Sequence, residues 1–157
     1  MNSTLPPRSG PVRAPGPGRP SSLLCGVWPG RRGLSAVVVD EYGAAHPPLL
    51  VSTSLPESRC ELLDHIDSTE GLDWQLVIPD WLARTDLLAQ LALAHGTAVW
   101  SVPSHLVDTV SVLGRVDRLP AHRLAAALAR LPRIHFLRGE LYRLRPPDQR
   151  QLNLHLL

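Results

Sequence analysis

Residues 23–54, LLCGVWPGRRGLSAVVVDEYGAAHPPLLVSTS, contain three apolar runs separated by turn-forming residues. The runs are rich in Leu and Val, and Val in particular favours strands. The first run ends at Pro29-Gly30 and the second at Asp40–Gly43, which are sequences typical of turns. Because short turns join antiparallel neighbours, this stretch predicts a three-stranded meander at Leu23–Trp28, Leu34–Val39 and Pro48–Ser54.

Helical and strand patterns alternate after this meander. Helices are predicted where leucines recur at helical spacing between Pro and Gly, and strands where short apolar runs stand between them. The predicted helices are 56–70, 81–95, 103–113 and 120–131, and the predicted strands are 74–78 and 98–102. The order β-β-β-α-β-α-β-α-α predicts an α/β domain with a mixed five-stranded sheet and helices on its faces.

The two ends of the chain depart from this pattern. Residues 1–21 are dominated by Pro, Gly, Ser and Arg, so we predict a disordered tail, followed by a domain over residues 22–131. Residues 132–157 form a C-terminal extension with two open interpretations. One is a hairpin of 134–137 with 140–144, and the other is a partner-binding tail with alternating Leu152, Leu154 and Leu156.

Charge is unevenly distributed along the chain. Residues 1–39 carry five Arg and no acid, residues 40–117 carry twelve acids and three Arg, and residues 118–157 carry eight Arg and two acids. Basic ends suit contact with nucleic-acid phosphates, in DNA or RNA. The alternative is that they pair with the acidic middle of the same chain. The candidate nucleic-acid-binding residues are Arg31, Arg32, Arg115, Arg118, Arg133, Arg138, Arg143 and Arg145.

Several classes of function find no motif in the sequence. The two cysteines, Cys25 and Cys60, do not form a CxxC pair, and no Cys/His cluster predicts a zinc site. Neither a Walker loop nor a GxGxxG loop is present, so no cofactor is predicted. Without an apolar leader or a run of membrane-spanning length, the expected location is the cytoplasm.

Three short motifs stand at corresponding points of the predicted elements. They are Gly26–Gly30 (GVWPG) in the first strand, Leu76–Asp80 (LVIPD) after the fourth, and Arg115–Ala125 (RVDRLPAHRLA) at the last helix. Together they resemble the RuvC-like, ribonuclease-H-like domain of Piv-type DNA invertases and DEDD insertion-sequence transposases. Val102-Pro103 also stands where that family has Asn-Pro. The resemblance implies the ribonuclease-H-like fold for this chain.

The resemblance also implies the positions of a two-metal nuclease site. Trp28 stands in place of its first-strand Asp, Asp80 is the acid nearest its Glu, Asp117 matches one Asp of its last motif, and Pro120 replaces the other. Trp and Pro cannot bind Mg²⁺, which requires oxygen ligands. We therefore interpret these four residues as vestigial and predict no metal and no enzymatic activity. Capping of the following helix is the alternative role for Asp80.

Three functional hypotheses follow. The first is a catalytically degenerate, nucleic-acid-associated accessory protein, of a mobile or conjugative element. The second is a protein-interaction or structural module without a nucleic-acid role, for example in a pilus or secretion assembly, with a protein partner at the C-terminal tail. The third is an active nuclease with a divergent carboxylate set around Asp80 and Asp117. The sequence leaves the oligomeric state open.

Overall fold

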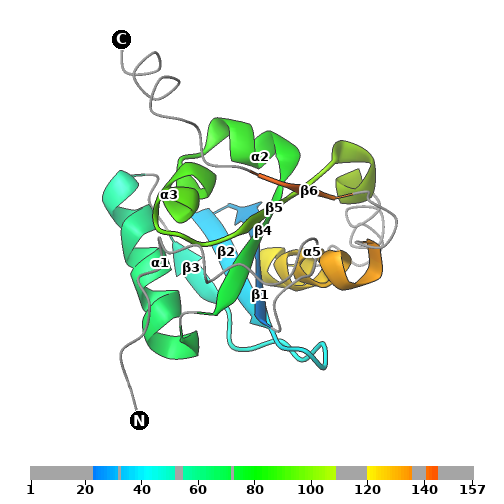
Figure 1. Cartoon of the computed structure of the whole chain (residues 1–157), viewed down its shortest axis with the longest axis horizontal. Coiled ribbons are helices and arrows are strands. Elements are labelled where there is room, and N and C mark those ends of the chain that lie inside the picture. Colours follow the sequence, from blue (N-terminus) through cyan, green and yellow to red (C-terminus); the bar gives the residue numbers. More distant parts are fainter. Residues whose placement is uncertain are drawn as a thin grey trace.

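The computed structural model describes residues 23–31, 33–51, 55–71, 73–108, 120–135 and 141–144. Its centre is a sheet with the strand order β3-β2-β1-β4-β5-β6 (Figure 1). The strands are β1 (Leu23–Gly30), β2 (Gly33–Val39), β3 (Leu49–Val51), β4 (Trp74–Pro79), β5 (Val99–Val102) and β6 (Tyr142–Arg143). The predicted tail of residues 1–21 and the leucines after residue 150 lie outside the described part of the chain.

The meander predicted from residues 23–54 is confirmed. β1 pairs antiparallel with β2, and β2 pairs antiparallel with β3. β4 then joins β1 in parallel, and β5 joins β4 in parallel, so the sheet is mixed, as predicted. The described sheet has six strands rather than the predicted five, because β6 pairs antiparallel with β5. A strand of two residues is too short to carry an alternating pattern, which is why the sequence did not reveal it.

Helices cover both faces of the sheet (Figure 1). The helices are α1 (Pro56–Glu70), α2 (Asp80–Thr85), α3 (Leu88–Ala94) and α5 (Ala121–His135), with a further helical turn at 104–108. Side chains from α1, α2 and α3 share one apolar core with one face of β1, β2, β4 and β5. Side chains from α5 and from the turn at 104–108 share the core on the opposite face. None of the helices in the described ranges is long and apolar enough to cross a membrane.

α5 lies directly on β1, and Gly26 makes this contact possible. A Cβ atom built at Gly26 would lie 2.0 Å from the carbonyl oxygen of Ala125 and 2.9 Å from the backbone nitrogen of Ala129. Both of those residues are small and fully buried. The strand and helix backbones therefore approach to a distance that leaves room for hydrogen alone at position 26.

The single helix predicted over 81–95 is two helices. The chain leaves the helical conformation at Asp86, which has φ −119° and ψ 147°. The Asp86 carboxylate accepts hydrogen bonds from Arg59 Nε at 3.0 Å and Nη2 at 2.8 Å, and its Oδ1 accepts one from the N–H of Leu88 at 2.8 Å. The break is therefore set by a partner on α1, which the leucine spacing within 81–95 does not register.

The last helix is longer than predicted. It continues through Pro132 to His135, four residues beyond the predicted end at Leu131. Ile134 therefore lies in α5 and not in the first strand of a hairpin, whereas residues 142–143 of the C-terminal extension join the sheet as β6. For the predicted helix over 103–113, residues 109–113 lie outside the described ranges.

Candidate functional site

The carboxyl ends of β1 and β4 meet at one edge of the sheet. The two strands are parallel, and Gly26 pairs with Val77. Trp28, two residues further along β1, packs against the core under α5, and Val77 belongs to that same core. Because side chains alternate along a strand, Pro79 shares the face of Val77 and Trp28. The last residue of β4 is therefore a proline that lies on the same face of the sheet as Trp28.

A pocket of about 570 Å³ opens between this end of β1 and the start of α5. Trp28 and Pro120, which are 92 residues apart in the chain and stand where the resemblance implies metal ligands, both line it, together with Arg31. Gly30 of β1 lies close to Ala121 of α5: a Cβ atom built at Gly30 would lie 3.1 Å from Cβ of Ala121. The described residues that line this pocket include no carboxylate; they are Trp28, Pro29, Gly30, Arg31, Pro120, Ala121 and Leu124.

Asp80 does not line this pocket. Its Oδ1 accepts a hydrogen bond from Ser101 Oγ at 3.5 Å, and its Oδ2 lies 3.4 Å from Arg84 Nη1. The capping role predicted for Asp80 is wrong, since Pro79 is the N-cap residue, no side chain caps the helix, and Asp80 is the first helical residue. In that first turn its charge still interacts favourably with the helix dipole. The predicted N-cap position is one residue too late, because Pro79 is the N-cap and not the first residue of the helix.

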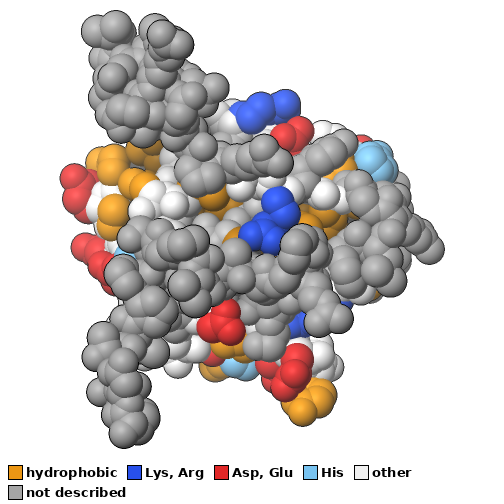
Figure 2. Space-filling view, viewed as in Figure 1, with side chains coloured by type: hydrophobic (Ala, Val, Ile, Leu, Met, Phe, Trp, Pro, Cys, Tyr) orange, Lys and Arg blue, Asp and Glu red, His pale blue; other side chains and the backbone are white. Residues whose placement is uncertain are grey.

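The structure describes three of the candidate arginines and separates them. Arg31 lines the pocket beside Trp28. Arg133 lies near the end of α5, where burial lowers the pKa of its guanidinium against the opposing charges of Asp40 and Glu41. The guanidinium of Arg143 lies 5.0 Å from the centre of the Trp100 ring, and burial lowers its pKa as well. In the face shown in Figure 2, the described basic side chains are scattered rather than gathered into one patch.

The remaining candidates lie outside the described ranges. They are Asp117 of the last motif and the arginines Arg32, Arg115, Arg118, Arg138 and Arg145. Their assignment to a nucleic-acid surface, and that of Asp117 to a vestigial site, stay predictions.

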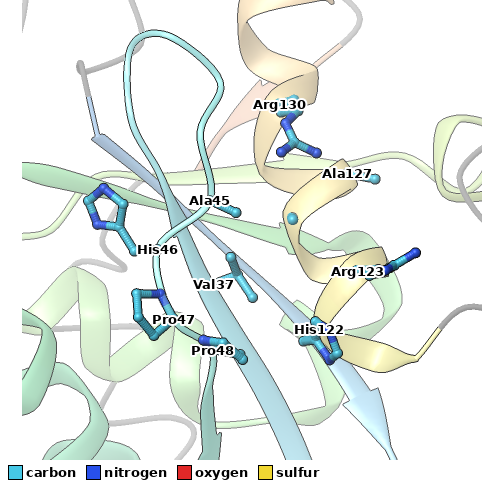
Figure 3. Close-up of a pocket in the computed structure, with 10 residues that line it drawn as sticks. Val37, Ala45, His46, Pro47, Pro48, His122, Arg123, Ala127 and Arg130 are labelled. Carbon is cyan, nitrogen blue, oxygen red and sulfur yellow. The ribbon is translucent and has the colours of Figure 1, made fainter.

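A second pocket, of about 670 Å³, lies between α5 and the segment that connects β2 to β3 (Figure 3). We call it the α5 groove. Its lining consists of Val37, Ala45, His46, Pro47, Pro48, His122, Arg123, Ala126, Ala127 and Arg130. Sequence analysis missed this groove, because its two walls come from segments about 75 residues apart and neither contains a recognisable motif. The available signal was the Pro47-Pro48 pair, of which the sequence analysis assigns Pro48 to the start of a strand.

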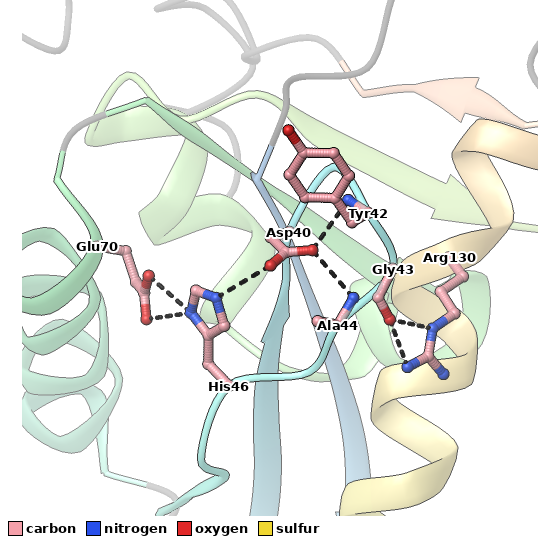
Figure 4. Close-up of polar contacts among 7 residues, drawn as sticks. All are labelled: Asp40, Tyr42, Gly43, Ala44, His46, Glu70 and Arg130. Atoms are coloured by element: carbon pink, nitrogen blue, oxygen red, sulfur yellow. Dashed lines mark hydrogen bonds and ion pairs between the residues drawn. The ribbon is translucent and has the colours of Figure 1, made fainter.

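Polar contacts hold the segment that forms one wall of the α5 groove (Figure 4). Asp40 Oδ1 accepts hydrogen bonds from the backbone N–H groups of Tyr42 and Ala44, each at 2.9 Å. Arg130 of α5 donates two hydrogen bonds to the carbonyl oxygen of Gly43, from Nε at 3.1 Å and Nη2 at 2.8 Å. The bond from Ala44 is the main reason that the pKa of Asp40 is lowered. Burial is the next largest influence and opposes it, while the bond from Tyr42 and the charges of His46 and Arg133 lower the pKa further.

His46 connects the same segment to α1. Its Nδ1 lies 2.8 Å from Oε2 of Glu70, the last residue of α1, and its Nε2 lies 3.9 Å from Oδ2 of Asp40. The backbone N–H of His46 donates to the carbonyl oxygen of Val38 at 2.8 Å. The two ring nitrogens therefore face two different carboxylates, so His46 links the loop to the helix.

One group of side chains in the described ranges has the spacing of metal ligands. Single ligand atoms of Asp64, Asp67 and His95 lie within 4.8 Å of one another. Asp67 Oδ2 lies 2.7 Å from His95 Nε2, and Asp67 Oδ1 accepts a hydrogen bond from Trp74 Nε1 at 2.8 Å. These residues belong to α1 and the end of α3, on the opposite face of the sheet from α5. They are therefore separate from the Trp28 pocket, and the pair Asp67–His95 joins two helices.

A solved structure resembles this chain over most of its length. RuvC of T. thermophilus, in complex with a Holliday junction substrate, matches with a TM-score of 0.51 and 15% sequence identity. The match covers 78% of this chain and 99% of the RuvC chain. The likeness confirms the RuvC-like, ribonuclease-H-like fold that the motifs implied. No protein-family model matches the chain, and no curated protein matches it.

Proposed function

We propose that this protein is a ribonuclease-H-like domain that binds nucleic acid without cleaving it, as an accessory protein of a mobile or conjugative element. The observation that carries the proposal is the Trp28 pocket. It lies where the family resemblance implies metal-binding carboxylates, and its described lining consists of apolar residues, glycine and Arg31. Two-metal cleavage requires several carboxylates converging on ions about 3.5–4 Å apart.

The residues at this edge of the sheet support binding without catalysis. Trp28 is half-buried on the core side of the pocket, so an aromatic ring occupies the place of the expected first ligand. Asp80 does not line the pocket, and its oxygens lie 3.5 Å from Ser101 Oγ and 3.4 Å from Arg84 Nη1. An arginine beside a partly exposed tryptophan suits a phosphate next to an unstacked base. The arginine-rich ends of the chain supply the long-range attraction for a polyanion.

The test is fluorescence anisotropy of the full chain with labelled single-stranded, duplex and four-way-junction nucleic acid at several salt concentrations. We expect an affinity that falls steeply as salt rises, because binding through phosphates releases counterions. Incubation of the same samples with Mg²⁺ or Mn²⁺ should produce no cleavage products on a denaturing gel. Arg31→Gln should weaken binding several-fold, whereas Arg84→Gln, which removes an equal charge paired with Asp80, should not.

Two results would overturn the proposal. Metal-dependent cleavage that disappears in Asp80→Asn and Asp117→Asn would establish the divergent nuclease instead. Failure to bind any of the nucleic acids even at low salt would exclude the nucleic-acid role. It would leave the protein-interaction module, for which a partner would then be sought by crosslinking of the full chain.

A further inference from the structure

The α5 groove has the size and chemistry of a small-molecule site. Ligand pockets commonly measure about 300–1,000 Å³, and this one measures about 670 Å³. Its walls are mainly aliphatic, from Val37, Ala45, Pro47, Pro48, Ala126 and Ala127. Every ionisable residue of its lining is basic or a histidine: His46, His122, Arg123 and Arg130. An occupant that matches both properties is apolar over most of its length and carries one negative charge.

We propose that the α5 groove binds a small amphiphilic anion, namely a carboxylate with a medium-length hydrocarbon chain. This proposal is independent of the nucleic-acid role, which concerns the Trp28 pocket at the start of α5. The two pockets share α5 but no lining residue.

The distribution of charge around the groove places the two ends of the ligand. His46 already faces the carboxylates of Glu70 and Asp40, so its end of the groove does not attract a further anion. On the α5 side, Arg123 is exposed, and Arg130 donates two hydrogen bonds to the neutral carbonyl of Gly43. Among the described residues, no ion pair neutralises either arginine. The carboxylate therefore belongs on the α5 side, at the end of the groove formed by His122 and Arg123.

The apolar walls accept the hydrocarbon chain. Val37 and Ala126 are buried at the base of the groove, 2% and 6% exposed, and Pro47 and Pro48 form the opposite wall. Proline has no backbone N–H group, so this wall offers fewer hydrogen-bond donors than ordinary backbone would. In Figure 3 the His122 ring and Pro48 face each other across the opening. A base or sugar edge would find few polar partners between these walls, whereas a methylene chain needs none.

The groove is pre-formed in the free protein. The loop from Asp40 to His46 is fastened by its own turn, by Arg130 of α5 and by Glu70 of α1, as Figure 4 shows. A wall that is already ordered does not lose further conformational entropy when a ligand binds. The contacts of Asp40, Arg130 and Glu70 thus keep the two sides of the groove apart at a set distance.

The experiment is isothermal titration of the full chain with decanoate, decanol, decyltrimethylammonium and acetate, each below its aggregation concentration. We expect decanoate to bind at least about tenfold more tightly than decanol, since hydrogen bonds to a charged group are the stronger ones. Decyltrimethylammonium should not bind, because its charge is repelled, and acetate should not bind, because it has no chain to bury. Equal binding of decanoate and decanol would overturn the anionic part of the proposal.

Two pairs of variants locate the site. Ala45→Leu extends a side chain from the loop toward α5, into the groove, and should weaken decanoate binding by about tenfold or more (Figure 3). Ala94→Leu makes the same change at an exposed position of α3 and should leave the affinity unchanged. The double variant His122→Gln, Arg123→Gln should weaken decanoate but not decanol, and Arg84→Gln should affect neither.

Thermal melts of each variant separate loss of the site from loss of the fold. Decanoate binding that survives both Ala45→Leu and the double variant would place the ligand elsewhere and overturn the proposal. Loss of nucleic-acid binding in the Arg31→Gln variant with decanoate binding retained would show that the two sites act separately. The decanoate titration therefore tests the groove independently of the nucleic-acid result.

Discussion

The two faces of the sheet are held by different kinds of interaction. On the face covered by α1, α2 and α3, charged side chains fasten the elements to one another, as in Arg59–Asp86 and Asp67–His95. On the other face, α5 lies on β1 through close backbone packing at Gly26. The Trp28 pocket lies at the start of α5, and the α5 groove lies along its flank. A face covered by one long helix leaves hollows at the helix sides, where ligands can bind.

The largest effect is expected on the α5 face. Gly26→Val would place side-chain atoms in the space that the Ala125 carbonyl occupies, and α5 would have to move away from β1. We expect a loss of more than about 4 kcal/mol in the free energy of unfolding, or failure to fold, measured by urea denaturation.

Gly71→Ala is the matched control for that variant. Gly71 has φ +88° and ψ −173°, a conformation that only glycine adopts readily, but a Cβ there would meet nothing within 4 Å. Its cost should be about 1–3 kcal/mol, from backbone strain alone. An equal loss in the two variants would show that the close approach of α5 to β1 is not what holds this face.

The next largest effect is expected on the opposite face. Asp86→Ala leaves the guanidinium of Arg59, whose side chain is only 5% exposed, without its carboxylate, and removes the acceptor for Leu88 N–H. A loss of about 3–5 kcal/mol should follow. Adding Arg59→Met to Asp86→Ala should restore part of it, because the buried guanidinium that has lost its carboxylate is then removed. Additive losses in this double-mutant cycle would contradict a coupled pair.

The same pair makes one face sensitive to acid. Burial raises the pKa of Asp86, but the bond from Arg59, the N–H of Leu88 and the charge of Arg59 outweigh it and hold the pKa below its usual value of 3.8. A lowered carboxyl pKa means stability that is present above the unfolded-state value and is lost as pH falls through the lower folded value. The stability difference between wild type and Asp86→Asn should therefore be constant from pH 7 to about 5 and shrink below about 4. A difference that is unchanged down to pH 2.5 would exclude this origin.

The smallest effect is expected for an exposed pair at the edge of the sheet. Arg84 lies 3.4 Å from Asp80, four residues earlier in α2, and its side chain is 68% exposed. Arg84→Gln should change the free energy of unfolding by less than about 0.5 kcal/mol, and added salt should abolish even that. This small value is what qualifies Arg84→Gln as the charge control in both binding experiments. A loss above 1 kcal/mol in urea denaturation would disqualify it.

Local patterns in the sequence determined the meander, the succession of the first five strands along the chain, and the chemistry of the residues at the positions where the resemblance implies a site. Apolar runs of strand length, bounded by Pro and Gly, express a preference that each segment carries by itself. That Trp28 and Pro120 cannot bind Mg²⁺ is equally visible in the sequence, because neither side chain carries an oxygen ligand in any fold.

The tertiary structure alone decided how distant segments meet. The break at Asp86 depends on Arg59, which is 27 residues away, and β6 exists because Val99–Val102 offers it an edge. The structure also decided that Pro79, and not Asp80, faces the side of Trp28, since a shift of one residue reverses the face of a strand. Both pockets have walls from segments far apart in the chain, and their chemistry arises only where those segments pack together.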